Sequence, residues 1–343
     1  MGVGKRIRLL IIDDSAIYRE GIAKGVSSDP KIQVVATAVD AFDARDKIIK
    51  YQPDVITCDV EMPKMNGIDF IRWLIPQYPL PVIMVSGVTN IVFDAMDSGA
   101  VDFVAKPSKT SKKYIKSFID ELIKKIRIAS EAKVQPKLRD TREYGIRNSA
   151  NIDRNKIIAI GASTGGTEAI FNILKNLPRD APGIAIVQHI PSGFSKMFAD
   201  RLNATTGLQV KEARTGDEIK TGKALIAPGD KHMRIKKIAN KYKVECFEGD
   251  KVNGHRPSVD ILFESVAREV GRNSIGLILT GMGYDGAKGL LAMKRKGART
   301  IGQDEKTSIV YGMPRVAYDI GAVEKQIPLY NIPQTLYEML MLR

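Results

Sequence analysis

Two glycines flank a serine in the stretch G-A-S-T-G, residues 161 to 165, directly after the apolar run IIAI. Flanking glycines let the chain turn sharply from a strand into a helix, which exposes the serine hydroxyl and directs helix N–H groups to the same place. Ser163 is therefore a candidate nucleophile. Because similar turns also bind phosphate, the motif alone does not decide between acyl transfer and phosphate binding.

A serine nucleophile needs a base, and the chain has three histidines. His189 ends the apolar run GIAIVQ, the next predicted strand after Ser163, and parallel strands direct their carboxyl ends to one edge of a sheet. His232 and His255 have no such placement, so structural roles are favoured for them. Asp285 follows the predicted strand IGLILT and would orient the base. The order Ser, His, Asp differs from the Ser, Asp, His order of α/β-hydrolases.

A second set of strand-end residues lies in the N-terminal part of the chain. Asp13 and Asp14 end the first predicted strand, and Asp59 ends the third. Clustered carboxylates repel one another unless a cation joins them, and Mg²⁺ prefers hard oxygen ligands. Lys106 and Ser86 end two later strands and would neutralise a phosphoryl group while Asp59 attacks it. Single acidic residues at strand ends are usually solvated, but five polar positions in this order favour a phosphoryl-accepting site.

The pattern of apolar runs predicts two α/β domains. Five runs, RLLIID, IQVVATA, DVITCDV, VIMVSG and AVDFVAKP, alternate with segments of helical spacing and predict a five-stranded doubly wound parallel sheet in residues 1–125. Residues 126–153 contain the end of an amphipathic helix and a basic, aperiodic linker. Apolar strands resume after it, so residues 154–343 are predicted to form a larger, doubly wound and mostly parallel α/β domain.

Composition restricts the protein's environment and partners. Cys58 and Cys246 are the two cysteines of 343 residues and lie far apart, which favours a reducing compartment. No run is long enough for a signal peptide or a membrane span, so we expect a cytoplasmic protein without direct membrane insertion. Residues 109–156 carry 14 Lys or Arg against 6 Asp or Glu, a net of +8 out of the total of +14. Because the basic excess is concentrated in the linker, we expect no nucleic-acid partner.

Four stretches, IIDDSAIYRE, CDVEMPKMNG, MVSG and DFVAKPS, resemble the receiver domain of two-component response regulators over roughly the first 125 residues. The resemblance implies Mg²⁺ bound by Asp14, Asp59 and the backbone carbonyl of Glu61, and phosphorylation of Asp59 by a histidine kinase. It implies a switch role for Phe103, although plain core packing explains this residue equally well. It also implies a cis peptide bond at Lys106-Pro107.

Five further stretches, AIGASTGG, VQHIP, APGD, HRPSVD and TGMGYDGAKGL, resemble the catalytic domain of chemotaxis protein-glutamate methylesterases, which also follows a receiver domain. The resemblance implies hydrolysis of glutamyl methyl esters, and deamidation of certain glutamines, on the cytoplasmic helices of chemoreceptors. Ser163 would be the nucleophile, His189 the general base and then acid, and Asp285 the orienting carboxylate. Backbone N–H groups of Met282 and Thr164 would form the oxyanion hole.

The same resemblance implies that this domain needs no cofactor, and the scattered histidines also argue against a metal there. It implies that the unphosphorylated receiver obstructs the active site. The expected partners are therefore a chemotaxis histidine kinase and methylated chemoreceptors, and we expect a monomer.

Three other interpretations are compatible with parts of the sequence. Gly281, Gly283 and Gly286 spell G-x-G-x-x-G after a strand, and Asp304 follows the next strand, as in an NAD-dependent enzyme. That fingerprint belongs at the first strand of its domain, however, and here it comes late. A DNA-binding response regulator would suit the positive charge, but a long α/β pattern replaces the short helix-turn-helix domain. A receiver fused to an inactive esterase-like binding domain also fits the sequence.

Overall fold

The computed structural model describes residues 5–87, 92–107, 111–134 and 152–341. The chain divides into two compact units, Met1–Arg139 and Asp140–Arg343. Residues 135–151 of the expected linker lie outside the described residues. Among the residues that the structure describes, no helix combines the length and apolar character needed to cross a bilayer.

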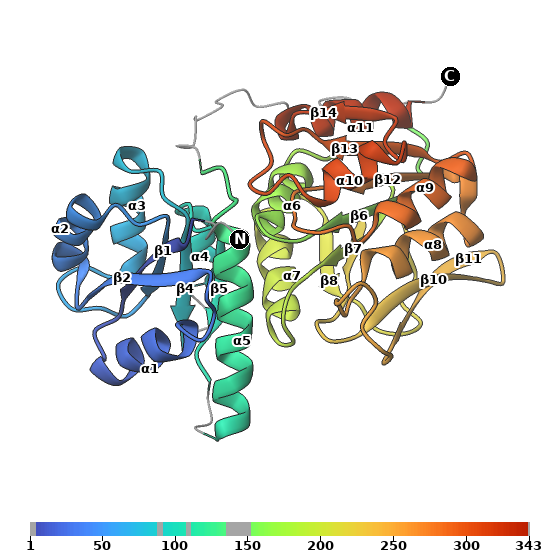
Figure 1. Cartoon of the computed structure of the whole chain (residues 1–343). Helices are drawn as coiled ribbons and strands as arrows, with labels where there is room; N and C mark the ends of the chain where they lie inside the picture. The colour runs from blue at the N-terminus through green and yellow to red at the C-terminus, as the bar shows by residue number, and fades with distance from the viewer. Residues whose placement is uncertain (1–4, 88–91, 108–110, 135–151, 342–343) are drawn as a thin grey trace. The chain divides into compact units, whose positions relative to one another are not determined.

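The N-terminal unit contains a five-stranded parallel sheet of order β2-β1-β3-β4-β5, as the sequence predicts (Figure 1). Every residue of β3 and β4 is buried, without alternation, because helices cover both faces of the sheet. Helix α1 packs with α5, and α3 packs with α4. The bounds are β1 Ile7–Ile12, α1 Ala16–Val26, β2 Ile32–Ala38, α2 Ala41–Tyr51, β3 Val55–Asp59, α3 Gly67–Gln77, β4 Val82–Ser86, α4 Val92–Asp97, β5 Asp102–Ala105 and α5 Lys112–Ala129.

The C-terminal unit contains a seven-stranded parallel sheet of order β14-β13-β12-β6-β7-β9-β8. Five of these strands are predicted by the sequence, and the short edge strands β8 and β14 are not. The strands are β6 Ile157–Ala162, β7 Gly183–Gln188, β8 Gln209–Glu212, β9 Lys223–Ile226, β12 Ser274–Ile278, β13 Arg299–Gln303 and β14 Lys325–Ile327. The helices are α6 Gly166–Lys175, α7 Phe194–Thr205, α8 Val259–Glu269, α9 Ala287–Arg295, α10 Met313–Asp319 and α11 Ile332–Leu340.

An antiparallel hairpin lies outside this sheet and was not predicted. Strands β10 (His232–Ile238) and β11 (Lys241–Phe247) pair across a two-residue turn in which Ala239 and Asn240 have φ of 47° and 63°. Positive φ at both turn residues matches the twist of a tight hairpin. Met233 and Ile235 of β10 are buried, and the strand packs against α8, so the hairpin extends the core.

Strand order places the predicted site residues. In the C-terminal sheet, β6 lies between β7 and β12, and the chain moves outward from β6 in opposite directions. In the N-terminal sheet, β1 has the same position between β2 and β3. Ligand sites of open α/β sheets form outside the carboxyl ends of strands at such switch points.

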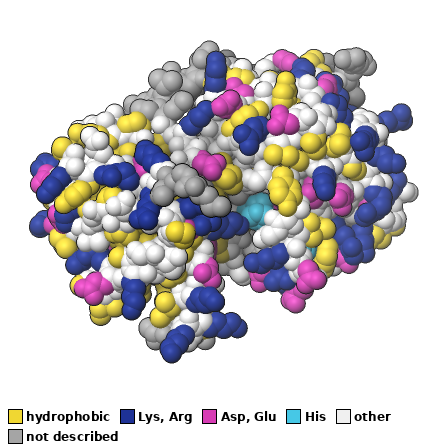
Figure 2. Space-filling view, in the orientation of Figure 1, with side chains coloured by type: hydrophobic (Ala, Val, Ile, Leu, Met, Phe, Trp, Pro, Cys, Tyr) yellow, Lys and Arg dark blue, Asp and Glu magenta, His cyan; other side chains and the backbone are white. Residues whose placement is uncertain are grey.

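Figure 2 shows Lys and Arg side chains on both units, with fewer acidic side chains among them. One backbone expectation is wrong. Within the described ranges the structure has a single cis peptide bond, Arg256-Pro257, and Lys106-Pro107 is not cis.

Close contact between α8 and β6 makes Gly161 sensitive to substitution. A Cβ atom at Gly161 would lie 2.2 Å from Val259 Cγ1 and 3.1 Å from Phe263 Cζ. We expect Gly161→Ala to lower the free energy of unfolding by about 1–3 kcal/mol, because the core has no room for a methyl group. Gly21→Ala has open space within helix α1, so it should be neutral or raise stability by up to about 1 kcal/mol. Calorimetry of both variants tests the contrast, and equal effects would contradict it.

Candidate functional sites

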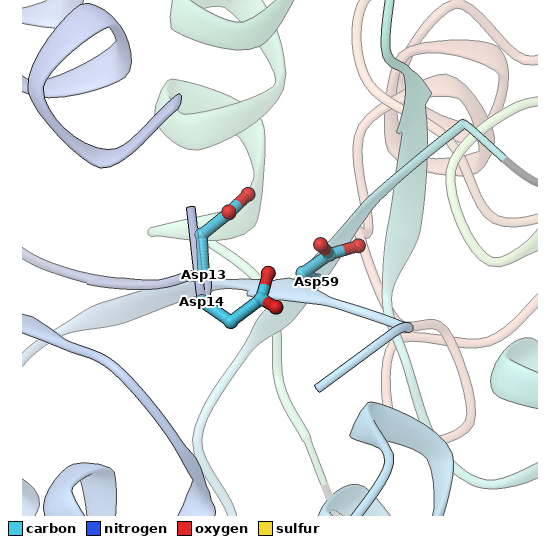
Figure 3. Close-up of side chains that lie close together, drawn as sticks. All are labelled: Asp13, Asp14 and Asp59. Carbon is cyan, nitrogen blue, oxygen red and sulfur yellow. The ribbon is translucent and has the colours of Figure 1, made fainter. Parts of the chain in front are cut away.

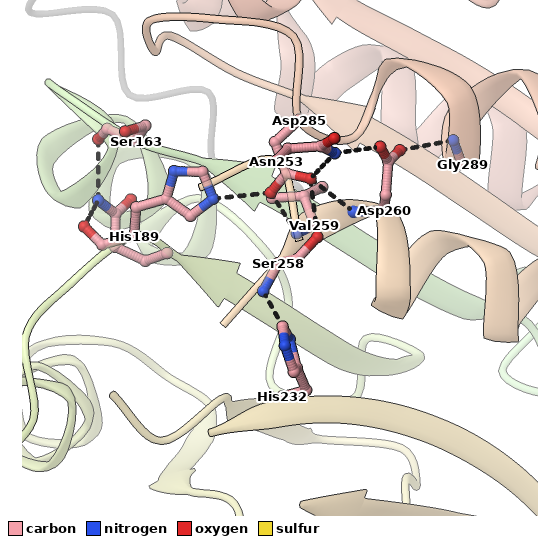
Figure 4. Close-up of polar contacts among 10 residues, drawn as sticks. Ser163, His189, His232, Asn253, Ser258, Val259, Asp260, Asp285 and Gly289 are labelled. Carbon is pink, nitrogen blue, oxygen red and sulfur yellow. Dashed lines mark hydrogen bonds and ion pairs between the residues drawn. The ribbon is translucent and has the colours of Figure 1, made fainter. Parts of the chain in front are cut away.

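Ser163, His189 and Asp285 come from three neighbouring strand ends and lie together in the C-terminal unit (Figure 4). The Ser163 N–H donates to the carbonyl of Thr280 at 3.0 Å, and the His189 N–H donates to the carbonyl of Ala162 at 3.0 Å. These bonds join the ends of β6, β7 and β12. The predicted convergence of these three residues is therefore present in the structure.

His189 faces Asp285 through one ring nitrogen. Its Nε2 lies 2.9 Å from Asp285 Oδ2, while the buried Nδ1 has no hydrogen-bond partner among the described residues. Because an ionised carboxylate can only accept, Nε2 carries a proton, and in the neutral imidazole Nδ1 then keeps its lone pair. Figure 4 shows the ring between Ser163 and Asp285. Serine proteases use the opposite orientation, with Nδ1 on the carboxylate, but either nitrogen can serve as the base.

Five donors hold the carboxylate of Asp285, which is 1% exposed. Besides His189, it accepts hydrogen bonds from Asn253 Nδ2 at 2.8 Å, Ser258 Oγ at 2.7 Å, the Val259 N–H at 2.7 Å and the Asp260 N–H at 3.3 Å. Burial alone would raise the pKa of Asp285, but the interaction with His189 and the other donors outweigh it and hold the pKa below its usual range. Asp285 is therefore a fixed negative charge beside the imidazole.

A further layer of polar groups supports this carboxylate and was not predicted. His232 is buried; its Nδ1 accepts the Ser258 N–H at 3.2 Å, and its Nε2 lies 2.8 Å from the carbonyl of Asp250. His232 is therefore bonded on both nitrogens away from Ser163. Asp260 accepts a hydrogen bond from Asn253 Nδ2 at 2.7 Å. Burial and the nearby charge of Asp285 raise the pKa of Asp260, although its hydrogen bonds act in the opposite direction.

The turn after β12 lies against the serine. A Cβ atom at Gly281 would lie 2.6 Å from Ser163 Cβ, so this approach requires glycine. Thr280 Oγ1 donates to the carbonyl of Thr164 at 2.9 Å and ties the two turns together. Within the described part of the chain, the Met282 N–H makes no backbone hydrogen bond. The turn therefore offers a backbone donor beside Ser163.

Gln188, which no sequence motif indicates, also fixes the serine turn. Its Nε2 donates to the carbonyl of Ser163 at 2.8 Å and to that of His189 at 3.2 Å. A Cβ atom at Gly166 would lie 2.1 Å from Gln188 Oε1. Because residue 166 is glycine, there is room for the side-chain amide of Gln188, which links the ends of β6 and β7.

The NAD interpretation requires Asp304 to bind the ribose, but the contacts of Asp304 do not fit this role. The carboxylate of Asp304 accepts hydrogen bonds from the N–H of Thr307 at 3.0 Å and from Thr307 Oγ1 at 2.6 Å. Asp304 therefore closes its own turn, as Asp residues commonly do. Gly283 and Gly286 have φ of 90° and 89°, so the turn needs them for conformational reasons alone.

Asp13, Asp14 and Asp59 gather at the carboxyl end of the N-terminal sheet (Figure 3). One oxygen from each of the three lies within 4.8 Å of the others. Lys106 Nζ lies 2.8 Å from Asp13 Oδ2 and 2.5 Å from Asp59 Oδ2. Burial raises the pKa of Asp59, an effect that the charge of Lys106 reduces and that of Asp13 increases. Three carboxylates with one ammonium leave negative charge that a hard divalent cation would balance, so the residues fit Mg²⁺.

The remaining predicted receiver residues lie around this cluster. The Glu61 N–H lies 3.4 Å from Asp59 Oδ1, and Ser86 ends β4 with its carbonyl accepting the Lys106 N–H at 2.9 Å. Phe103 is 4% exposed, and its ring centroid lies 4.9 Å from Lys125 Nζ. The position of Phe103 is that of a core residue in this structure.

Ionisation of Asp285 should contribute to stability. Its folded-state pKa lies below the value of about 3.9 of an unfolded aspartate, so the contribution is present above about pH 4 and is lost as the pH falls through the folded-state value. Asp285→Asn cannot ionise and leaves buried donors badly paired. We expect it to be less stable than wild type by about 2–4 kcal/mol at pH 7, and by less at pH 3. Calorimetry at both pH values tests this, and a difference that does not change with pH would contradict it.

Comparisons with known proteins agree with this geometry. Residues 158–336 match the family model described as CheB methylesterase, and residues 9–116 match that of the response regulator receiver domain. A protein-glutamate methylesterase/protein-glutamine glutaminase 2 of Syntrophomonas wolfei is 56% identical over 98% of both chains. The protein-glutamate methylesterase/protein-glutamine glutaminase of Salmonella typhimurium is 43% identical over 96% of both.

The C-terminal unit also matches a solved structure. The Thermotoga maritima CheB methylesterase catalytic domain has a TM-score of 0.53 and 41% identity, and the match covers 98% of that domain and 54% of this chain. The family matches, the full-length relatives and the Ser163, His189 and Asp285 cluster agree with one another. This chain belongs to the CheB methylesterase family, with a receiver domain preceding the catalytic domain.

Proposed function

We propose that this protein removes methyl groups from glutamyl methyl esters of chemoreceptors, and deamidates specific glutamines, through Ser163, His189 and Asp285. The observation that supports this best is the His189 ring, which is anchored on Asp285 through Nε2 and whose Nδ1 has no hydrogen-bond partner in the described part of the chain. A base held by a buried carboxylate beside a serine turn is the arrangement that acyl transfer needs. The relatives from Syntrophomonas wolfei and Salmonella typhimurium are named for the same two activities.

The chemistry follows from the positions of these groups. Ser163 Oγ attacks the ester carbonyl carbon while His189 Nδ1 takes its proton. The tetrahedral oxyanion receives hydrogen bonds from the backbone N–H groups of Met282 and Thr164. As the intermediate collapses, the protonated His189 gives its proton to the leaving oxygen, and methanol departs. Water then attacks the acyl-serine with His189 again as the base, which regenerates Ser163 and releases the glutamate carboxylate.

Deamidation follows the same course, with ammonia as the leaving group. During each transfer Asp285 stabilises the imidazolium and keeps its ring in place. This domain requires no cofactor in the proposed reaction.

The receiver domain supplies regulation in this proposal. A chemotaxis histidine kinase donates a phosphoryl group to Asp59. Asp13, Asp14, Asp59 and the Glu61 carbonyl would hold Mg²⁺, which would supply positive charge for the phosphoryl oxygens. Lys106 forms ion pairs with both Asp13 and Asp59. A phosphoryl group on Asp59 would therefore change the partners of Lys106.

Ser86 would supply a hydroxyl to the same phosphoryl group, and Phe103 would respond to the change at Lys106. A difference in contacts of this kind can shift the receiver between an inhibitory and a permissive state. We further propose that the protein acts in the cytoplasm as a monomer, with residues 1–125, 126–153 and 154–343 as receiver, linker and catalytic domain.

Removal of the serine hydroxyl should abolish methyl ester hydrolysis. We expect Ser163→Ala to lower the rate of methanol release from methylated chemoreceptors by about 10⁴-fold, with an unchanged melting temperature. Thr205→Ala, at the exposed end of α7, removes a hydroxyl of the same domain and should have wild-type activity. Retention of hydrolysis by Ser163→Ala would refute the assignment of the nucleophile.

Phosphorylation at Asp59 should stimulate the reaction. With Mg²⁺ and a small phosphodonor, we expect wild-type methanol release to rise by about 5- to 100-fold, the usual range of allosteric coupling. In Asp59→Asn, and in wild type with a chelator, the ratio of stimulated to unstimulated rate should be close to one. Stimulation that persists in Asp59→Asn would refute the proposed site.

A further inference from the structure

A second imidazole, that of His255, lies flat against the ring of His189. The two ring centroids are 3.7 Å apart and the planes differ by 5°. We propose that His255 is a positioning residue for the methylesterase reaction, and that its ring fixes the plane of the His189 ring so that Nδ1 stays directed at Ser163. The proposal rests on the proposed role of His189 as the base.

The contacts of His189 explain why it needs such support. The ring has one hydrogen bond, from Nε2 to Asp285, and none at Nδ1 within the described residues. A single bond fixes one nitrogen but leaves the tilt of the ring undetermined, because χ2 of histidine has broad energy wells. A flat neighbour at contact distance restricts that tilt. Since misplacement of a reacting group by about 1 Å can cost about 100-fold in rate, the restriction matters for catalysis.

The backbone of His255 is held independently of His189. Val252 and His255 exchange two N–H···O bonds of 3.0 and 2.9 Å across a turn formed by Asn253 and Gly254. These two residues have φ of 53° and 80°. The Asn-Gly pair is the preferred sequence for a two-residue hairpin turn with positive φ at both positions. The turn therefore holds the backbone of His255 in a fixed position.

The residue after His255 adds a second attachment. The Arg256 guanidinium donates to Asp230 Oδ1 at 3.0 and 2.7 Å and to the carbonyl of Gly249 at 2.5 Å. The same turn also places Asn253 Nδ2 on the carboxylate of Asp285. One short segment thus orients both the base and its carboxylate, and His255 is the member of that segment that contacts the base.

Two variants of His255 distinguish the effect of its flat ring from the effect of its polar atoms. Leucine has comparable bulk but no ring, whereas phenylalanine keeps a flat ring without polar atoms. We expect His255→Leu to lower kcat for methanol release by about 10- to 100-fold with unchanged KM, because only the geometry of proton transfer is affected. His255→Phe should recover kcat to within about threefold of wild type. The rate at which a small fluorophosphonate modifies Ser163 should follow kcat, since this reagent needs no receptor contacts.

Several results would overturn the proposal: wild-type kcat in His255→Leu, a loss confined to KM, or a phenylalanine variant no better than leucine. If the leucine variant unfolds, a folded His255→Phe with less than a tenth of wild-type kcat also overturns it. Lys251→Ala, an exposed substitution in the same loop, is the control and should match wild type. Failure of the proposed function has a different signature: wild type would then release no methanol, or hydrolysis would persist in Ser163→Ala, whatever residue stands at position 255.

Discussion

The buried charge of Asp285 is the interaction on which the catalytic unit depends. A carboxylate with so little exposure would take up a proton if it lacked donors. Here Asn253, Ser258, Val259 and His189 all donate to it, and they hold its pKa low. The charge then determines which nitrogen of His189 carries a proton, and so which nitrogen is left for Ser163. The hairpin turn, the start of α8 and the turn after β12 are arranged around this one group.

The two units use the same sheet geometry for opposite electrostatic purposes. Each collects carboxylates at a switch point of a parallel sheet. Asp285 is surrounded by donors because its charge must stay fixed. Asp59 has the ammonium of Lys106 and two carboxylate neighbours, so burial dominates and its pKa is raised. The role proposed for Asp59, accepting a phosphoryl group beside a metal ion, needs this less saturated environment, since its oxygens must remain available.

The glycine pattern after β12 illustrates how one motif can serve different chemistries. Gly281 permits the contact with Ser163, and a Cβ atom at Gly286 would lie 2.4 Å from Val259 Cγ1. Gly283 has a positive φ that the turn requires. Each glycine thus has a packing or conformational reason that involves no pyrophosphate. The exposed N–H groups of such a turn suit any developing negative charge, and the residues around them decide which one is bound.

The sequence by itself determined the two α/β units, their central strands and the sheet edges at which the site residues lie, Asp59 in the N-terminal unit and Ser163, His189 and Asp285 in the C-terminal unit. It did so because apolar runs and strand-end residues are local signals, and a parallel sheet converts strand ends into spatial neighbours. The tertiary structure alone decided which groups support the edge that carries Ser163, His189 and Asp285. Three supporting residues, Gln188, His232 and Asn253, act through contacts with residues distant in the sequence. The β10–β11 hairpin is held by strand pairing and burial. Its sequence is rich in charged residues, so the alternation of apolar and polar residues predicts these strands only weakly. The stacking of His255 on His189 belongs to this second class, because no periodicity or spacing records the distance between two rings brought together by folding.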